Sequence, residues 1–235
     1  MNRFLFWLIT AIIAIAILTS LLSYKDISEN SPGGTTVENN NNTLDSADQK
    51  NNSVSPNSLP AGQSSKSTFQ SPLGRAGERI TKKKFGQFIT PQNSPVQPER
   101  FSGYHTGADF EIFPEESNVD VVVKAVCDGK LLTARTASGY GGIAVQSCEL
   151  DGGPVTIIYG HLNIASVKFK TGDEIKAGDT LVFLGAAYSS QTDGERKHLH
   201  LGIHKGSAVD IQGYVNSKSE LEGWVNPCSV QDICQ

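Results

Sequence analysis

This chain of 235 residues has no strong excess of either charge and no basic segment interleaved with aromatic side chains. Its 20 lysines and arginines are matched by 24 aspartates and glutamates, which gives a formal net charge of −4. Two short basic clusters, at residues 82–84 and 196–197, are of a kind that most often forms solvated edges. Because nucleic-acid binding needs a concentrated positive surface, the sequence predicts no nucleic-acid partner.

Cysteine is scarce, and no two of the four cysteines stand in a CxxC spacing, which argues against a zinc site built from them. Cys127, Cys148, Cys228 and Cys234 all lie in the part of the chain that we place outside the cytoplasm, where disulfides persist. Three pairings are possible. We expect Cys127 with Cys148, which flank neighbouring strands, and Cys228 with Cys234, which can close a small loop.

No apolar run long enough to span a membrane occurs after residue 24. Residues 1–24 are nearly all apolar, and about twenty such residues cross a bilayer core. A cleaved signal peptide is the alternative, but this run exceeds the usual roughly 7–15 residues and lacks a good cleavage site. No cysteine follows it, which argues against a lipoprotein. We therefore expect a single-pass anchor in the cytoplasmic membrane with the remainder extracytoplasmic, or a secreted protein if the segment is cleaved.

Aromatic side chains are almost missing from residues 25–77, which consist mainly of Asn, Ser, Gln, Gly and Pro. Such a segment cannot bury enough apolar surface to offset the entropy lost when it is ordered. We expect a disordered linker. It either lets a tethered domain search its surroundings or serves only as a spacer.

Helical periodicity is missing from residues 78–235 before a short stretch at 217–221, so we expect one all-β domain with a sizeable core. Turn sequences separate nine expected strands at 84–89, 107–112, 119–126, 130–134, 142–146, 155–161, 166–169, 180–184 and 198–204. Residues 170–184 resemble the strand and turn unit of biotinyl and lipoyl barrels. A carrier function is excluded, because no acceptor lysine stands at a hairpin tip.

Histidine occurs only five times, yet three histidines gather in residues 197–204 (KHLHLGIH). Side chains alternate faces along a strand, so His198, His200 and His204 point one way, while the aliphatic residues between them point into a core. A polar surface is the ordinary explanation for one such histidine. Three on one face, with the other two histidines also in distinctive segments, indicate a site.

The other two histidines lie in separate segments. His105 precedes Asp109 by four positions, and in an extended chain the two would be about 13 Å apart. A shared metal therefore requires a bend, which Gly107 permits. Residues 155–163 form an apolar strand that ends by presenting His161. Taken alone, each segment also fits an ordinary loop or strand-end histidine.

In order and spacing, residues 105–109 (HTGAD), 159–162 (YGHL) and 198–200 (HLH) resemble the motifs of LytM/lysostaphin-type zinc metalloendopeptidases of bacterial cell walls. The GYGG segment at 139–142 and the turns near 172 and 178 also fall where that family has them. The resemblance covers about residues 85–227. It implies a duplicated hybrid-motif domain with a two-sheet or barrel-like β fold.

The resemblance also implies the roles of five side chains. His105, Asp109 and His200 would bind Zn²⁺, since two imidazoles and one carboxylate suit a catalytic site with a fourth position open for water. His161 and His198 would not bind the metal. They would orient the water, accept its proton and stabilise the oxyanion.

The chain departs from the family pattern just before the HxH pair, where residues 195–197 (Glu-Arg-Lys) replace the small residues that are common there. The two cations are expected by the cleft, either contacting acidic groups of the substrate or solvated. His204 lies outside the motif and is expected at the rim. Residues 188–196 are expected to form a loop that walls the groove.

The function expected from the resemblance is hydrolysis of peptide bonds in peptidoglycan stem peptides or cross-bridges. A wall-bound module that activates another hydrolase without cutting is the alternative, and the intact set of five motif residues argues against it. A phosphoryl carrier would need the cytoplasm, which the apolar amino terminus opposes. The motif does not identify the bond that is cut, and a regulatory protein partner stays open.

Overall fold

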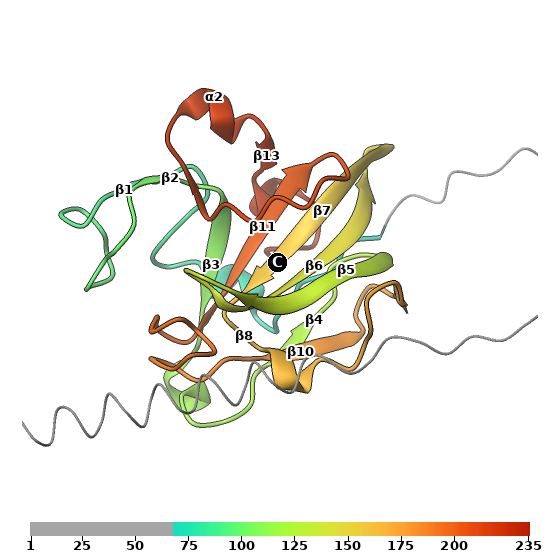
Figure 1. Ribbon diagram of the computed structural model, residues 1–235, viewed down its shortest axis with the longest axis horizontal. Helices are drawn as coiled ribbons and strands as arrows, with labels where there is room; N and C mark the ends of the chain where they lie inside the picture. Colours follow the sequence, from blue (N-terminus) through green and yellow to red (C-terminus); the bar gives the residue numbers. More distant parts are fainter. Residues whose placement is uncertain (1–67) are drawn as a thin grey trace, which may run out of the picture. The chain divides into compact units, whose positions relative to one another are not determined.

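The computed structural model describes residues 68–235 (Figure 1). The predicted anchor at residues 1–24 and most of the predicted linker lie outside the described residues. Within the described part, no helix combines the length and apolar character needed to cross a membrane.

A seven-stranded antiparallel sheet forms the centre of the described structure, in the order β13-β11-β7-β6-β5-β9, with β3 also paired to β11. Its strands are β3 (Gly107–Glu111), β5 (Gly129–Ala137), β6 (Gly141–Leu150), β7 (Gly153–Gly160), β9 (Glu174–Ile175), β11 (His198–Lys205) and β13 (Trp224–Val225). In Figure 1, β5, β6, β7 and β11 lie side by side across the molecule.

Two smaller antiparallel sheets complete the β structure. One has the order β4-β10-β8, and the other has the order β1-β2-β12. Their strands are β4 (Val122–Lys124), β8 (Leu162–Asn163), β10 (Thr180–Leu184), β1 (Phe88–Ile89), β2 (Gly103–His105) and β12 (Tyr214–Val215). The remaining elements are the short helix α2 (Lys218–Leu221) and the 3-10 turns η1 (Ala76–Glu78), η2 (Pro114–Glu116), η3 (Ile164–Ser166) and η4 (Pro227–Ser229). The predicted all-β class is confirmed.

The β6–β7 hairpin shows how local sequence fixes the register of the large sheet. Leu150 pairs with Gly153, which leaves Asp151 and Gly152 as a two-residue loop. Both loop residues have positive φ, 53° for Asp151 and 79° for Gly152. An Asp-Gly pair in this conformation is the turn whose twist matches two antiparallel strands.

Side chains alternate between two hydrophobic clusters across the large sheet. Leu199, Leu201 and Ile203 of β11 are fully buried in the larger cluster, as the alternation of the sequence predicted. On β7, Ile157 joins the same cluster, while its neighbour Ile158 packs in a second cluster with Trp224 and others. Both faces of the central strands are therefore covered, and this close packing holds β7 and β11 rigidly in the middle of the domain.

Both disulfides occur as expected, Cys127 with Cys148 and Cys228 with Cys234, and no cysteine among the described residues is free. The first joins the chain just after β4 to β6, with its Cα atoms 6.2 Å apart. The second closes the loop after η4, with a Cα separation of 5.1 Å.

The structure differs from the sequence prediction at several boundaries, including the start of the packed region and the strand expected at 166–169. Phe69 and Leu73 are buried in the larger cluster, so the packed region begins before the predicted start at residue 78. The sequence did not indicate this earlier start, because two isolated apolar residues among polar ones show no periodicity. The expected strand at 166–169 begins instead in η3, where the hydroxyl of Ser166 donates to the Asn163 carbonyl and accepts from the Phe183 amide.

Candidate metal centre

The bend that the spacing of His105 and Asp109 requires lies at Thr106, between β2 and β3. The Thr106 amide donates to the Gly213 carbonyl at 3.1 Å, and its hydroxyl donates to the Gln212 carbonyl, which anchor the bend. A Cβ atom on Gly107 would lie 2.7 Å from His200 Nε2. Glycine at this position therefore makes room for the His200 ring.

Pairing of β3 with β11 brings the third side chain to the same place. Asp109 lies opposite His200 in the register of these strands. The alternation along β11 then puts His198 on the same face as His200 and opposite Glu111. Two strands that are far apart in the sequence thus bring the predicted site residues together.

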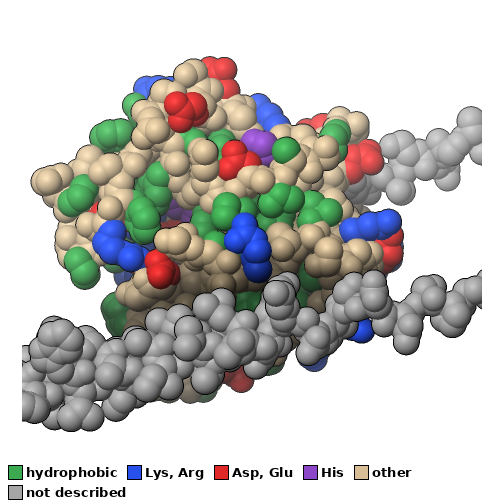
Figure 2. Space-filling view, in the orientation of Figure 1, with side chains coloured by type: hydrophobic (Ala, Val, Ile, Leu, Met, Phe, Trp, Pro, Cys, Tyr) green, Lys and Arg blue, Asp and Glu red, His purple; other side chains and the backbone are tan. Residues whose placement is uncertain are grey.

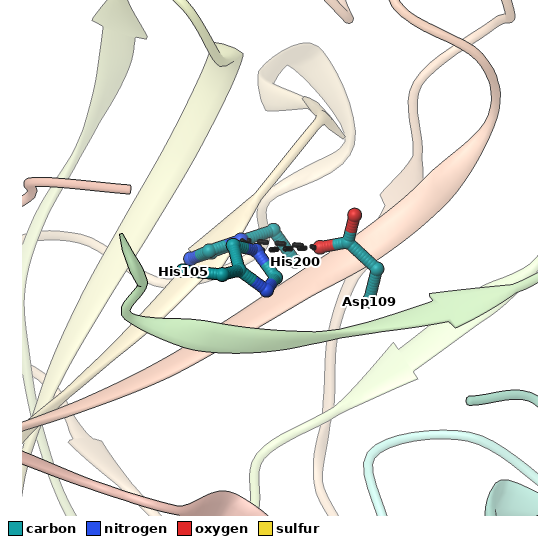
Figure 3. Close-up of side chains that lie close together, drawn as sticks. All are labelled: His105, Asp109 and His200. Carbon is teal, nitrogen blue, oxygen red and sulfur yellow. Dashed lines mark hydrogen bonds and ion pairs between the residues drawn. The ribbon is translucent and has the colours of Figure 1, made fainter. Parts of the chain in front are cut away.

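Three ligand atoms form a small triangle, as Figure 3 shows. His105 Nε2 lies 3.0 Å from His200 Nδ1 and 3.3 Å from Asp109 Oδ1, and the last two atoms are 3.2 Å apart. Ligands at about 2.0–2.1 Å from a tetrahedral zinc ion are separated by about 3.3–3.4 Å from one another. The donor set and spacing of these buried residues fit such an ion.

A backbone carbonyl fixes the tautomer of the His105 ring. The His105 Nδ1–H donates to the Lys84 carbonyl at 3.2 Å, so in the neutral ring the lone pair is on Nε2, which faces the other two ligands. His200 Nε2 is buried and has no hydrogen-bond partner among residues 68–235. Its Nδ1 faces the other two ligand atoms, 3.0 Å from His105 Nε2 and 3.2 Å from Asp109 Oδ1.

His198 and His161 lie together at the edge of the triangle, with ring centroids 4.2 Å apart. The His198 Nδ1–H donates to the Arg196 carbonyl at 2.9 Å, and Nε2 lies 3.3 Å from Asp109 Oδ2. His161 is outside β7, with φ of 64°, so the predicted strand at 155–161 ends one residue early. This left-handed conformation turns the chain at the end of the strand.

Burial and charge set the protonation of the site. Burial raises the pKa of Asp109, but the nearby charges of His198 and His105 outweigh it and hold that pKa well below its ordinary value. Burial lowers the pKa of His200 to about 4 and also lowers the pKa of His161, which the charge of His198 lowers further. These shifts favour an ionised Asp109 carboxylate and a neutral His200 imidazole, the states that metal ligands need.

The triangle lies in a cavity of about 380 Å³ with aromatic walls. Tyr214 stacks on Phe101 with ring centroids 5.6 Å apart and lies 5.2 Å from His105. Tyr140 packs edge-on against His200 at 5.3 Å. Figure 2 shows histidine side chains on this face among hydrophobic and polar groups, without a large patch of one charge.

The sequence did not identify Phe101 and Tyr214 as wall residues. They lie in segments without a motif and reach the site only because β1, β2 and β12 form their own sheet. Glu195 and Arg196, from the loop that was expected to wall the groove, do line the cavity. His204 does not. It packs against Trp224 with ring centroids 4.9 Å apart, and its Nε2 lies 3.9 Å from Asp210.

Arg196 lines the cavity, as expected, but neither Arg196 nor Lys197 is solvated. Both are buried. Lys197 Nζ donates to the backbone carbonyls of Glu116 and Val119, at 3.1 and 2.6 Å. Arg196 pairs with Asp109 and Glu111. These internal partners could not be recognised from the spacing of the sequence. Arg196 Nη1 is also buried but has no hydrogen-bond partner among the described residues.

Comparisons with known proteins agree with the motif. The model of Peptidase family M23 matches residues 103–211, which include all five predicted site residues. Endolysin 2638A of Staphylococcus phage 2638A is 30% identical over 142 residues, 60% of this chain and 27% of the endolysin. The chain thus spans about a quarter of the length of that curated relative.

Two solved structures are also similar to this chain. The catalytic domain of the antimicrobial peptidase lysostaphin from Staphylococcus simulans has 22% identity, and the match covers 65% of this chain and 91% of that one, with a TM-score of 0.44. LytU has 22% identity over 63% of this chain and 81% of its own, with a TM-score of 0.43. The residues that match the model of Peptidase family M23, 103–211, contain the whole candidate metal centre.

Proposed function

We propose that this chain is a zinc-dependent endopeptidase that hydrolyses peptide bonds in peptidoglycan stem peptides or cross-bridges. The observation that carries the proposal is the buried triangle of His105 Nε2, Asp109 Oδ1 and His200 Nδ1, with edges of 3.0–3.3 Å, in a groove that also holds His161 and His198. The match to the model of Peptidase family M23 and the similarity to an endolysin support the choice of substrate.

The chemistry that zinc supplies in such sites is polarisation of the scissile carbonyl and a water whose pKa falls toward about 7. His105, Asp109 and His200 are the residues that would hold the ion. The other two histidines act on the substrate and the water.

His198 is placed to handle the proton. Because its Nδ1–H is engaged by the Arg196 carbonyl, Nε2, which lies 3.3 Å from Asp109 Oδ2, is the ring atom that would orient the attacking water and accept its proton. His161 Nδ1 is buried and lacks a hydrogen-bond partner in the described structure. A hydrogen bond from this atom to the substrate would therefore not require breaking one within the protein. We assign His161 to stabilising the oxyanion of the tetrahedral intermediate.

We further propose that the domain works outside the cytoplasmic membrane, held there by residues 1–24. Two disulfides among the described residues support an oxidising compartment. A non-cleaving module that activates another hydrolase is the alternative, but no feature of the described site favours it over an enzyme.

Digestion of purified peptidoglycan by the full chain tests the function. We expect new muropeptide ends by mass spectrometry and about one zinc per chain by elemental analysis. His198→Ala should abolish the new ends, whereas His204→Ala, outside the groove, should retain them. Bound zinc with no cleavage of walls of several cross-bridge types would overturn the proposal in favour of the activator.

A further inference from the structure

Arg196 makes an unusual set of contacts for a residue next to a metal centre. Its Nη2 donates to Asp109 Oδ2 at 2.8 Å, and its Nε lies 3.0 Å from both carboxylate oxygens of Glu111. The same Nη2 also contacts Glu111 Oε1 at 2.5 Å. The guanidinium thus joins a predicted metal ligand to a second buried carboxylate. Arginine suits this position because its planar fork can bind two carboxylates at once.

The two carboxylate oxygens of Asp109 contact different groups. Oδ1 faces His105 and His200, while Oδ2 is bound by Arg196 and lies near His198. In Figure 3 one carboxylate oxygen points at the two histidines and the other points away from them. An unrestrained carboxylate can rotate and offer either oxygen, or both, to a metal. Arg196 removes that freedom.

Glu111 offsets the charge of Arg196. A guanidinium so close to a divalent ion would repel it, and its burial would be costly without a partner. Glu111 supplies a compensating negative charge from the same face of β3 as Asp109, two residues away, and Lys82 Nζ contacts its outer oxygen at 3.2 Å. The ion pair therefore orients Asp109 without adding an unbalanced positive charge.

We propose that Arg196, held by Glu111, is a positioning residue that fixes Asp109 with Oδ1 alone toward the metal and so raises zinc affinity. The inference rests on the metal site of the proposed function. The backbone carbonyl of Arg196 also holds His198, but a side-chain substitution leaves that contact in place. The side-chain effect can therefore be measured by itself.

Zinc affinity of the full chain, measured by competition with a chelator, tests the proposal. Arg196→Met should weaken affinity about 10- to 100-fold, the range for loss of a group that orients a metal ligand. Arg196→Lys keeps the charge but not the fork, so it should fall between wild type and Arg196→Met. Lys197→Met is the matched control. It removes an adjacent buried cation that contacts only the carbonyls of Glu116 and Val119, and it should keep wild-type affinity.

A double variant tests whether the pair acts as a unit. Glu111→Gln should weaken zinc binding on its own, because Arg196 then loses its anchor and its neutralising charge. In the Arg196→Met background the same change should weaken binding no further. The visible spectrum of Co²⁺-loaded Arg196→Lys should differ from that of the wild type if the orientation of Asp109 has changed.

The outcomes separate this inference from the proposed function. Unchanged zinc affinity and Co²⁺ spectra in Arg196→Met and Arg196→Lys would overturn the positioning role, even if wild type cleaves peptidoglycan. Weaker affinity in these variants, with Lys197→Met unaffected, would support it even if no wall is cleaved. If Arg196→Met does not fold, the zinc affinities of Arg196→Lys and Glu111→Gln test the positioning role instead. A wild-type chain that binds no zinc would overturn both proposals.

Discussion

His161 and His198 lie beside each other with their ring centroids 4.2 Å apart and their planes inclined by 35°. Neither contributes an atom to the triangle of His105, Asp109 and His200. The close pair and the triangle share one groove, yet their side chains hold different positions in it. Under the proposed roles, the triangle binds the metal and the close pair handles the proton, and variants can test this division.

We expect His105→Ala, Asp109→Ala and His200→Ala to lose zinc. His161→Ala and His198→Ala should keep about one zinc per chain and lose about 10²- to 10⁴-fold in turnover, the usual range for a general acid or base. Metal analysis and peptidoglycan digestion on the same samples measure both quantities. Loss of zinc in the second pair of variants would show that our division of roles is wrong.

Gly107→Ala should damage the metal centre without altering any ligand. The added Cβ would lie 2.7 Å from His200 Nε2 and 2.5 Å from the Leu201 carbonyl, so the ring or the strand pairing must move. We expect zinc affinity to fall at least about tenfold and stability to fall by about 1–3 kcal/mol, as for overpacked sites. Gly74→Ala, where a Cβ meets nothing within 4 Å, is the control and should change neither.

Acid should weaken the domain partly through Glu116. Hydrogen bonds from the buried Arg79, at 2.7 and 2.8 Å, are the main cause that lowers the pKa of Glu116. A carboxylate with a lowered pKa contributes stability that is fully present above its unfolded pKa of about 4.3 and is lost as pH falls through the lower folded pKa.

Denaturant unfolding at pH 7 and near pH 3 checks this contribution. Glu116→Gln should be less stable than the wild type at pH 7, and the difference should shrink in acid. Glu115→Gln removes the adjacent exposed carboxylate, whose contact with Arg75 is 3.9 Å, and should change little at either pH. An undiminished difference for Glu116→Gln near pH 3 would contradict the assignment.

The hydroxyl of Tyr140 is buried in the groove and has no hydrogen-bond partner within residues 68–235. Burial also raises its pKa far above the ordinary value, so it stays protonated. Tyr140→Phe removes an unsatisfied polar group and should not lower the free energy of unfolding. Tyr140→Ala, which also removes the ring that packs against His161 and His200, should cost about 3–5 kcal/mol. Thermal unfolding compares them. A Tyr140→Phe variant destabilised as much as Tyr140→Ala would reveal a hydrogen bond that these contacts do not include.

Sequence patterns predicted the elements whose signals are local. The alternation of β11 put Leu199, Leu201 and Ile203 in the core, and the turn residues Asp151 and Gly152 ended two strands. Short strands such as β9 and β12 were missed. Two residues carry no periodicity, and such strands form only because a neighbour supplies hydrogen-bond partners.

The motif residues were identified from their order along the chain, and the structure brings them together at one groove. The aromatic walls at Phe101 and Tyr214 were not identified, because nothing in the sequence links them to residues near 200. The burial of the Arg196 side chain was not predicted, for a related reason. Charge and spacing suggest a solvated cation, while the partners that bury it lie on β3, far away in the chain.

The sequence left three disulfide pairings open, and the structure has the expected one. The β class and, through the resemblance to LytM/lysostaphin-type peptidases, the five side chains of the candidate site were predicted from the sequence by itself. These depend on alternation, turn residues and residue type, which are properties of short segments. Only the tertiary structure decided how those side chains face one another, because distances between atoms depend on strand register and packing. The pairing of β3 with β11 put Asp109 opposite His200, and the ion pair of Arg196 with Glu111 set which oxygen of Asp109 faces the histidines.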